Sequence, residues 1–214
     1  GKHGEAIFVG SGSVEQLRAH STAIREEAVK NGRAANDVKI MSAFAAVVGS
    51  TEEEARRKYA EVADAQNPEV TVASYAWFTG LDLSSYAPET PMSELSTELS
   101  QTQVARFADK TVGDVLADWH AHGVGARPIV GTPEQVADRM IELADGADLD
   151  GFLFSPVIPP ASTKDFIEHV LPILKERGAI VDHPAEPQSL RERLLGTPTP
   201  ALADSHVGAS YRQG

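Results

Sequence analysis

The sequence predicts a parallel α/β fold, and three recurring segments are the basis for that prediction. Each segment runs from an apolar stretch through a glycine to a helix-capping residue and then into a helix: VGSGSVEQ, VVGSTEEE and IVGTPEQV. Strands whose carboxyl ends open into helix-starting loops are typical of βα units. Right-handed crossovers between such units give a parallel sheet, which is either open or closed into a barrel.

The first βα unit occupies the start of the chain. Residues 5–9 (EAIFV) are an apolar run that predicts a strand, followed by the loop Gly10 to Ser13. Ser13 and Gln16 have the spacing of a capping box, so a helix is expected from there to about Asn31. The dipeptide Asn31-Gly32 then supplies a helix stop signal.

The second and third units repeat this pattern. Residues 38–48 (VKIMSAFAAVV) predict a nearly unbroken apolar strand, and Thr51 caps the helix that follows. In the third unit Thr132 is the N-cap, with proline at the first helical position and glutamine at the third. The segment 151–155 (GFLFS) is short enough to be a strand buried on both faces.

A long insertion of about residues 67–127 separates the second and third units. Loops of this length in a compact domain are usually functional or disordered. The insertion contains Tyr75, Trp77, Phe78 and Tyr86, and this aromatic content argues against disorder. One or two helices are expected in its second half, from Thr97 to His122.

The last part of the chain predicts one more helix and a tail. Ser162 starts a helix with apolar residues at helical spacing, and Pro172 inside that pattern predicts a kink or an early break. From residue 182 the composition shifts to proline, glycine, serine and threonine. We therefore expect a main body over residues 1–181 and an extended C-terminal tail over 182–214.

Composition excludes several classes of function. The chain has 214 residues, 42% of them apolar, which is enough for a sizeable core. Its formal net charge of −12 disfavours binding to nucleic acid or to an anionic membrane. No apolar run approaches the ~20 residues that span a bilayer, and cysteine is absent, so disulfides are excluded. A cytoplasmic location is the default expectation.

Four segments carry a resemblance to a known family: GTPEQVADRM, DGFLFSP, DFIEHVLPILKERG and SLRERLLG. With them the sequence resembles the bacterial luciferase-like flavin monooxygenases, in particular the branch of nitrilotriacetate and dibenzothiophene-sulfone monooxygenases. The segment FTGLDLSSY is similar to the insertion of that family. The likeness runs along almost the whole chain.

The resemblance implies a two-component enzyme. Such an enzyme has a TIM-barrel fold, receives reduced FMN from a separate flavin reductase, and oxygenates a small organic substrate with O₂. The chain aligns with only the later half of the barrel, about three of its eight strands. The fold expected from the resemblance is therefore the C-terminal part of a TIM barrel, with a long insertion and an incomplete barrel. The partner expected is a missing N-terminal half-barrel or another copy in a homo-oligomer.

In a βα barrel the active site lies at the carboxyl ends of the strands. Phe8, Gly10 and Val130 resemble pocket-lining positions of the family. Ser155 ends a predicted strand, and Trp77 and Phe78 are the candidates in the insertion, although packing in a core or interface would explain them as well. The family's functional histidine has no counterpart at these insertion positions. No catalytic residue is assigned.

Three residues are candidates for binding an anion. Ser11 and Ser13 precede a helix whose free N–H groups attract negative charge, although capping explains them fully. Arg127 could hold a carboxylate, sulfonate or phosphate, or form a surface ion pair. His120 and His122 lack an evident third ligand, so no metal site is predicted.

Two alternatives stay open from the sequence. The chain could be a non-catalytic α/β fragment that acts as an assembly or binding module, with its exposed strand edges paired in an oligomer. It could also form an open flavodoxin-like sheet that binds an anion at Gly10 to Ser13.

Overall fold

The computed structural model describes residues 1–122, 127–180, 186–198 and 200–212. These residues form two compact units. The first unit combines Gly1–Ser50 with Pro128–Gly214, and the second is Thr51–Arg127. The second unit begins earlier than the insertion expected at about residue 67, because it includes the helix that follows the second strand.

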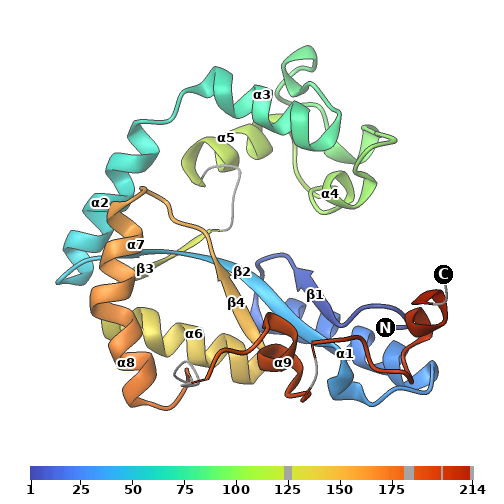
Figure 1. Ribbon diagram of the computed structural model, residues 1–214. Helices are drawn as coiled ribbons and strands as arrows, with labels where there is room; N and C mark the ends of the chain where they lie inside the picture. The colour runs from blue at the N-terminus through green and yellow to red at the C-terminus, as the bar shows by residue number, and fades with distance from the viewer. Residues whose placement is uncertain (123–126, 181–185, 199, 213–214) are drawn as a thin grey trace. The chain divides into compact units, whose positions relative to one another are not determined.

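Four parallel strands form the sheet of the first unit (Figure 1). They are β1 Ala6–Val9, β2 Lys39–Val48, β3 Pro128–Gly131 and β4 Gly151–Phe154. The long strand β2 is central, because each of the other three pairs with it. The predicted parallel α/β fold is confirmed, with four strands in the described residues instead of about three.

Helices of the first unit follow its strands in the expected order. They are α1 Val14–Lys30, the short 3₁₀ helix η1 Ala35–Asp37, α6 Pro133–Ala147, α7 Ala161–Asp165, the π-helical turn η4 Phe166–Val170 and α8 Leu171–Glu176. The capping boxes predicted at Ser13 and Thr132 are present, and Thr51 caps α2 by accepting the N–H of Glu54. Figure 1 shows α1 and α6 on the same side of β2.

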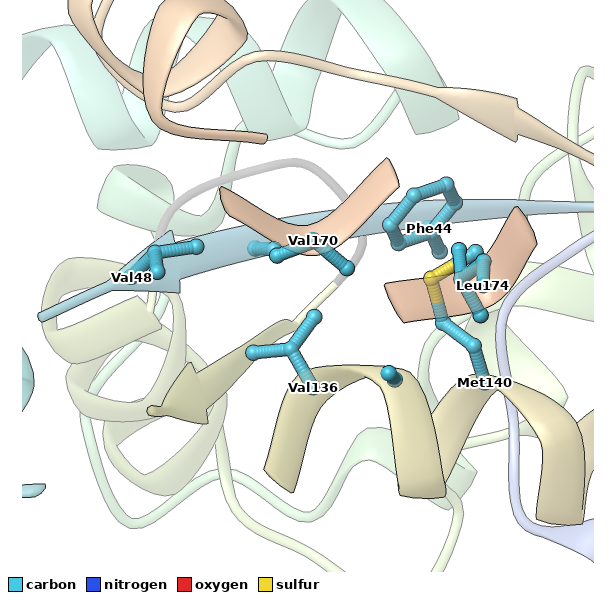
Figure 2. Packing of buried hydrophobic residues seen from close by; sticks show 8 residues of the cluster. Phe44, Val48, Val136, Met140, Val170 and Leu174 are labelled. Atoms are coloured by element: carbon cyan, nitrogen blue, oxygen red, sulfur yellow. The ribbon is translucent and has the colours of Figure 1, made fainter. Parts of the chain in front are cut away.

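The core of the first unit lies between β2 and these helices. In Figure 2, side chains from β2, α6 and the η4–α8 segment meet in one cluster, in which Phe44, Val48, Val136, Met140, Val170 and Leu174 are all buried. The rings of Phe152, Phe154 and Phe166 pack around Phe44 at centroid distances of 5.5, 5.1 and 5.5 Å. The face of α6 that its apolar spacing predicted to be buried is therefore the face that packs in this core.

The predicted early break at Pro172 is not seen, because the chain stays helical from α7 through η4 to the end of α8. The backbone N–H of Leu171 donates to the carbonyl of Phe166, five residues earlier, which makes η4 a π-helical turn. Pro172 then falls in the first turn of α8, where its missing N–H leaves no bond unmade.

The expectation that the 151–155 strand is buried on both faces is wrong. Successive residues of a strand point to opposite faces. Phe152 and Phe154 face the helices, whereas Leu153 points the other way and is 51% exposed. In the first unit, helices cover the side of the sheet that carries the two phenylalanines, so the opposite side keeps its exposure.

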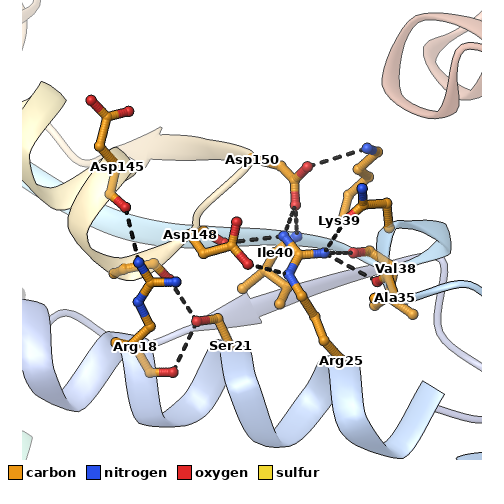
Figure 3. A network of polar contacts seen from close by, with 12 residues as sticks. Arg18, Ser21, Arg25, Ala35, Val38, Lys39, Ile40, Asp145, Asp148 and Asp150 are labelled. Carbon is orange, nitrogen blue, oxygen red and sulfur yellow. Dashed lines mark hydrogen bonds and ion pairs between the residues drawn. The ribbon is translucent and has the colours of Figure 1, made fainter. Parts of the chain in front are cut away.

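A polar network ties α1 to the loop between α6 and β4 (Figure 3). Its centre is Arg25, whose side chain is 11% exposed and contacts Asp148 at 2.7 Å and Asp150 at 3.1 Å. Arg25 also donates to the carbonyls of Ala35 and Val38. Because one guanidinium satisfies partners from several segments, the network fixes where β4 begins.

Short helices build the second unit. They are α2 Glu52–Asp64, α3 Pro68–Thr79, η2 Leu83–Ser85, η3 Met92–Glu94, α4 Gln101–Ala105 and α5 Val112–His122. Its core contains Tyr75, whose ring meets that of Trp119 edge-on at 4.7 Å, together with Leu83, Met92 and Val115. The predicted helices between Thr97 and His122 are confirmed as α4 and α5.

Helix α3 was not predicted, although its signals are present in the sequence. Asn67 caps it by accepting the N–H of Glu69, and Pro68 occupies the first helical position. Gly80 ends it with a φ of 76°. Its apolar residues surround the whole helix instead of forming a stripe, so periodicity gave no signal.

The C-terminal segment contains α9 Leu190–Leu195 and the 3₁₀ helix η5 Val207–Arg212. Arg191 forms an ion pair with Glu5, and the His206 ring contacts the carbonyl of His3 at 3.2 Å. These contacts join the segment to the start of the chain. The expected boundary between residues 181 and 182 lies outside the described residues.

None of the helices in the described ranges is both long enough and apolar enough to cross a membrane.

Candidate functional site

One face of the first unit's sheet carries apolar side chains that are exposed or half-buried. Paired residues of adjacent strands project to the same face. Phe8 pairs with Met41, and Ala43 pairs with Leu153, so these four side chains lie on one face, which we call the open face. Phe8 is 58% exposed. The open face is the side opposite the helices.

The candidate pocket residues of the first unit lie near the carboxyl ends of its strands. β1 ends opposite Ser42, and β4 ends opposite Phe44, so Gly10 and Ser155 follow at nearly the same level of β2. Val130 lies further along, opposite Val47. The ends of β1 and β3 are staggered by about 20 Å at roughly 3.3 Å per residue. The structure thus groups Gly10 with Ser155, whereas Val130 projects to the same face of the sheet further along β2.

A buried serine, which sequence reasoning missed, holds the end of β1. Ser42 is 1% exposed, and its hydroxyl donates to the carbonyl of Gly10 at 3.2 Å. The signal was present, because Ser42 is the only polar residue inside the apolar run 40–48. Its bond fixes where the loop after β1 begins.

Gly10 leaves open space beside the open face. A Cβ placed on this residue would have no heavy atom within 4 Å. Its backbone does not adopt a positive φ, so a side chain would cause no backbone strain. The glycine is therefore not required by the local packing.

Two of the three proposed anion-binding residues are already engaged. The Ser13 hydroxyl accepts the N–H of Gln16 as the cap of α1. Arg127 forms an ion pair with Asp118 inside the second unit. Of the three, Ser11 remains as the residue whose side chain is not committed to a cap or an ion pair in the described part of the chain.

Trp77 and Phe78 lie in the second unit on α3. Trp77 is 80% exposed, and Phe78 is 44% exposed, with their ring centroids 6.4 Å apart. They are not part of that unit's buried cluster, so its core does not explain their size. The structure describes each unit by itself, and these two residues stay candidates for pocket lining.

The second unit also contains a polar pair that sequence reasoning did not single out. The Tyr59 hydroxyl and the His122 Nδ1 lie 2.9 Å apart, and their rings stack. Burial raises the pKa of Tyr59, which the nearby Arg127 partly opposes. The pair connects α2 with α5, which is a packing role.

The residues present can be compared with what FMN requires. The flavin ring is flat, with an apolar dimethylbenzene end and a polar pyrimidine end, and the open face offers Phe8, Met41 and Leu153 as a wall for the apolar end. The phosphate needs donors, and of the proposed set only Ser11 is uncommitted. The first unit therefore offers an apolar surface to one end of the ring, whereas a phosphate site is not complete among these candidates.

A family model described as luciferase-like monooxygenase matches residues 1–149. This chain belongs to the luciferase-like monooxygenase family. The family predicted from the sequence is confirmed, and the parallel sheet corresponds to roughly half of the barrel found in such relatives.

Several known relatives of this luciferase-like chain are much longer than it is. The dimethyl-sulfide monooxygenase of Hyphomicrobium sulfonivorans is 33% identical over 97% of this chain and 44% of its own length. The long-chain alkane monooxygenase of Geobacillus thermodenitrificans (strain NG80-2) is 33% identical over 99% of this chain and 44% of its own. The chain thus spans less than half the length of these relatives.

Among solved structures, a riboflavin lyase (RcaE), determined with modified FMN and the substrate riboflavin, is 65% identical. It covers 100% of this chain and 47% of its own length, with a TM-score of 0.92. Nitrilotriacetate monooxygenase component A of Aminobacter aminovorans is only 27% identical. The narrower branch expected from the sequence is therefore not favoured.

Proposed function

We propose that this luciferase-like chain is the C-terminal part of an FMN-dependent two-component monooxygenase. Reduced FMN would come from a separate reductase, and the enzyme would oxygenate a small organic substrate with O₂. The observation that carries the proposal is the 65% identity to the riboflavin lyase, which spans the whole of this chain. The match covers less than half of that protein, so the activity is proposed for the whole protein and not for this chain alone.

Riboflavin, or a close isoalloxazine relative, is the first substrate to test. The relatives named for dimethyl sulfide and long-chain alkanes are 33% identical, about half of the identity to the riboflavin lyase. An open apolar face also suits a flat tricyclic ring better than it suits a small charged acid.

In this proposal the chain's own residues bind and orient a flavin ring. Phe8, Met41 and Leu153 form an apolar wall, and Gly10 leaves room at its rim. Ser11 is the donor available to a polar substituent of the flavin. The oxygen chemistry itself is supplied by the reduced flavin when it is bound.

Substitution at Gly10 tests this role without disturbing the fold. Purified chain is titrated with riboflavin and with FMN, alone and after mixing with the part of the riboflavin lyase that this chain does not cover. Flavin fluorescence and calorimetry report binding. We expect saturable binding that Gly10→Leu weakens about tenfold and Gly10→Ala weakens less, because the longer side chain occupies the open space.

Matched circular dichroism spectra and melting temperatures for the glycine variants provide the control. Binding by the chain alone would indicate an autonomous site. Binding only in the mixture would indicate a site completed by the remaining part. Absence of binding under both conditions, or equal affinity in the wild-type chain and Gly10→Leu, contradicts the assignment of a flavin site here.

A further inference from the structure

A cavity of about 410 Å³ lies at the amino ends of β1 and β2. Its described lining comes from three parts of the chain: the residues before β1, the connection from α1 to β2, and the C-terminal segment. In Figure 1 the C-terminal segment, in red, lies beside the N-terminus. Gly10 and Ser155 follow the carboxyl ends of their strands, so this cavity is distinct from the proposed flavin site.

Arg33 brings to this cavity a positive charge that no carboxylate balances within the described residues. Its guanidinium donates to the carbonyls of Gly1 and Gly4, at 2.8 and 2.7 Å. A third bond, of 3.0 Å, goes to the backbone carbonyl of Asp37. A guanidinium has more N–H donors than these carbonyls accept. Arg33 is therefore held in place and still has donors to offer a ligand.

The other charged groups around the cavity leave an excess of positive charge. Lys2 is exposed and has no ion-pair partner in the described part of the chain. Arg191 and Glu5 form an ion pair, so their charges offset each other. Asp37 is the remaining acidic residue of the described lining, and its carboxylate accepts the N–H of Ala34. The cavity therefore favours an anion, although the chain as a whole has a net charge of −12.

Apolar side chains of the C-terminal segment form another part of the cavity wall. Leu195 lies at the end of α9 and Val207 at the start of η5, and two alanines between them also line the cavity. The ring of His206 contacts the carbonyl of His3 at 3.2 Å, which helps to hold this segment on the rest of the first unit. A molecule in the cavity would therefore meet both basic groups and an apolar wall.

We infer that this cavity binds a small organic carboxylate. The carboxylate group pairs with Arg33 and Lys2, and the apolar body of the ligand contacts Leu195. A guanidinium matches the geometry of a carboxylate, and the cavity volume lies in the range usual for small-molecule pockets. A phosphate dianion fits less well, because the two acidic residues of the lining repel its additional charge.

Binding at this site would have a structural consequence. The ligand contacts the C-terminal segment and the start of the chain at the same time, so it would hold the two together. The inference does not depend on the proposed flavin function, because the cavity lies at the other end of β1 and β2.

Octanoate is the probe, because it joins a carboxylate to an apolar chain. Isothermal titration calorimetry on the full chain, at neutral pH and without flavin, compares it with octylamine, octyl phosphate and acetate. We expect saturable binding of octanoate and at least about tenfold weaker binding of the other compounds. Hydrogen exchange should show added protection of the backbone amides of α9 and η5 when octanoate is present.

Two leucines of α9 provide the matched comparison. Leu195→Asp places a carboxylate in the cavity, whereas Leu190→Asp places it at a position that is 76% exposed and outside the described lining. We expect Leu195→Asp to raise the dissociation constant for octanoate at least about tenfold and Leu190→Asp to change it less than about threefold. Circular dichroism and melting temperatures check that both variants fold.

A milder variant keeps the test decisive if Leu195→Asp displaces α9 from the rest of the unit. Lys2→Met removes an exposed charge that has no ion-pair partner among the described residues, so the fold should be unaffected. It should raise the dissociation constant about threefold, because one of the two basic partners of the carboxylate is lost.

Several outcomes would overturn the inference. The first is an absence of saturable octanoate binding, and the second is equal weakening by both α9 variants, since octanoate would then bind elsewhere. Octylamine binding as tightly as octanoate would show that the site selects only an apolar chain. Tighter binding of octyl phosphate would make the ligand a phosphate ester. Unchanged affinity in Lys2→Met, or binding without protection of α9 and η5, would contradict the assigned contacts.

Discussion

At the residue scale, Arg25 shows how one side chain can position several segments. It is mostly buried, and it bonds to two carboxylates and to three backbone carbonyls, those of Ala35, Val38 and Asp148. A charged group of this kind is stabilising only as long as its partners are present. Asp150 also bonds to the backbone N–H of Ile40, so the network reaches β2 directly.

We predict that Arg25→Met lowers the free energy of unfolding by roughly 2–3 kcal/mol, because it leaves partly buried carboxylates and carbonyls without their donor. Arg139→Met is the control, since Arg139 forms an exposed ion pair with Glu142 and its replacement should cost ~0–1 kcal/mol. Urea denaturation measures both. Equal losses would show that the network does not hold the fold.

Tyr75 is a residue-scale exception in the second unit. Its ring is fully buried, and its hydroxyl has no hydrogen-bond partner among the described residues. Burial accordingly raises the pKa of Tyr75. An unpaired buried hydroxyl loses its bond to water on folding without replacement.

We predict that Tyr75→Phe leaves the second unit unchanged or stabilises it by about 1 kcal/mol, because it removes the unpaired hydroxyl and keeps the ring against Trp119. Tyr75→Ala should instead cost about 3–5 kcal/mol through the cavity it creates. Thermal unfolding distinguishes the two. A clear loss of stability in Tyr75→Phe would mean that the hydroxyl has a partner, such as a buried water.

At the element scale, capping determines where the helices begin. Thr132 accepts the N–H of Gln135, and the Gln135 side chain accepts the N–H of Thr132 in return. Gly131 ends β3 immediately before, so the same few residues end a strand and start a helix.

We predict that Thr132→Ala lowers the free energy of unfolding by about 1 kcal/mol, whereas Thr132→Ser changes it little, because serine retains the capping oxygen. The comparison is made by chemical denaturation with matched buffers. If both variants were equally destabilised, the threonine methyl group, and not its cap, would be the stabilising feature.

The start of α5 contains a carboxyl group, that of Asp114, whose effect on the stability of the folded protein should depend on pH. Bonds from the backbone and hydroxyl of Thr111 hold the pKa of Asp114 below its usual 3.8. A carboxylate with a lowered pKa in the folded state stabilises the protein above its unfolded pKa, and the contribution is lost as the pH falls through the folded value. The charged form also suits the N-terminal end of the helix.

We therefore predict that the stability contributed by Asp114 is present at neutral pH and disappears below about pH 3.8. Asp114→Asn should reduce the pH dependence of unfolding in this acid range. Denaturation curves from pH 2 to 6 (roughly the range in which carboxyl groups titrate) compare the two proteins. Parallel curves would show that Asp114 titrates as an ordinary carboxyl group.

At the scale of the whole molecule, the first unit exposes apolar surface on its sheet. Phe8 and Leu153 are both more than half exposed and lie on the open face. Exposed apolar patches and strand edges promote association between molecules. This chain corresponds to less than half of the length of its relatives, and an exposed apolar sheet face is consistent with that.

We predict that the isolated chain self-associates weakly and in a concentration-dependent manner, as measured by sedimentation velocity. Leu153→Lys should reduce this association, because it places a charge on the open face. Leu190→Lys, at another highly exposed leucine, is the control and should have a smaller effect. A monomer at all concentrations would show that the open face is covered or tolerated in solution.

Much of the fold could be predicted from the sequence, and the helix starts show why. Ser13 and Thr132 act through partners three residues away, so local spacing is sufficient to find them. The apolar spacing of α6 likewise predicted the face that packs on β2. Helix α3 was missed because it is apolar on all sides, which removes the periodic signal.

The candidate site could be predicted only in part. Phe8, Gly10 and Ser155 do lie near the carboxyl ends of parallel strands, as chain order indicated. The engagement of Ser13 with Gln16 and of Arg127 with Asp118 decided which anion-binding candidates remained. Met41 joined the site only through its pairing with Phe8, which no local pattern indicates.

By itself, the sequence determined the parallel α/β class, the helix boundaries set by caps and the luciferase-like family, because these depend on residues close together in the chain or on overall resemblance. Only the tertiary structure decided that β2 is central, that Leu153 is exposed and that Arg25 joins distant segments. The physical reason is that strand register and burial arise from contacts between residues far apart in sequence, which local propensity does not encode.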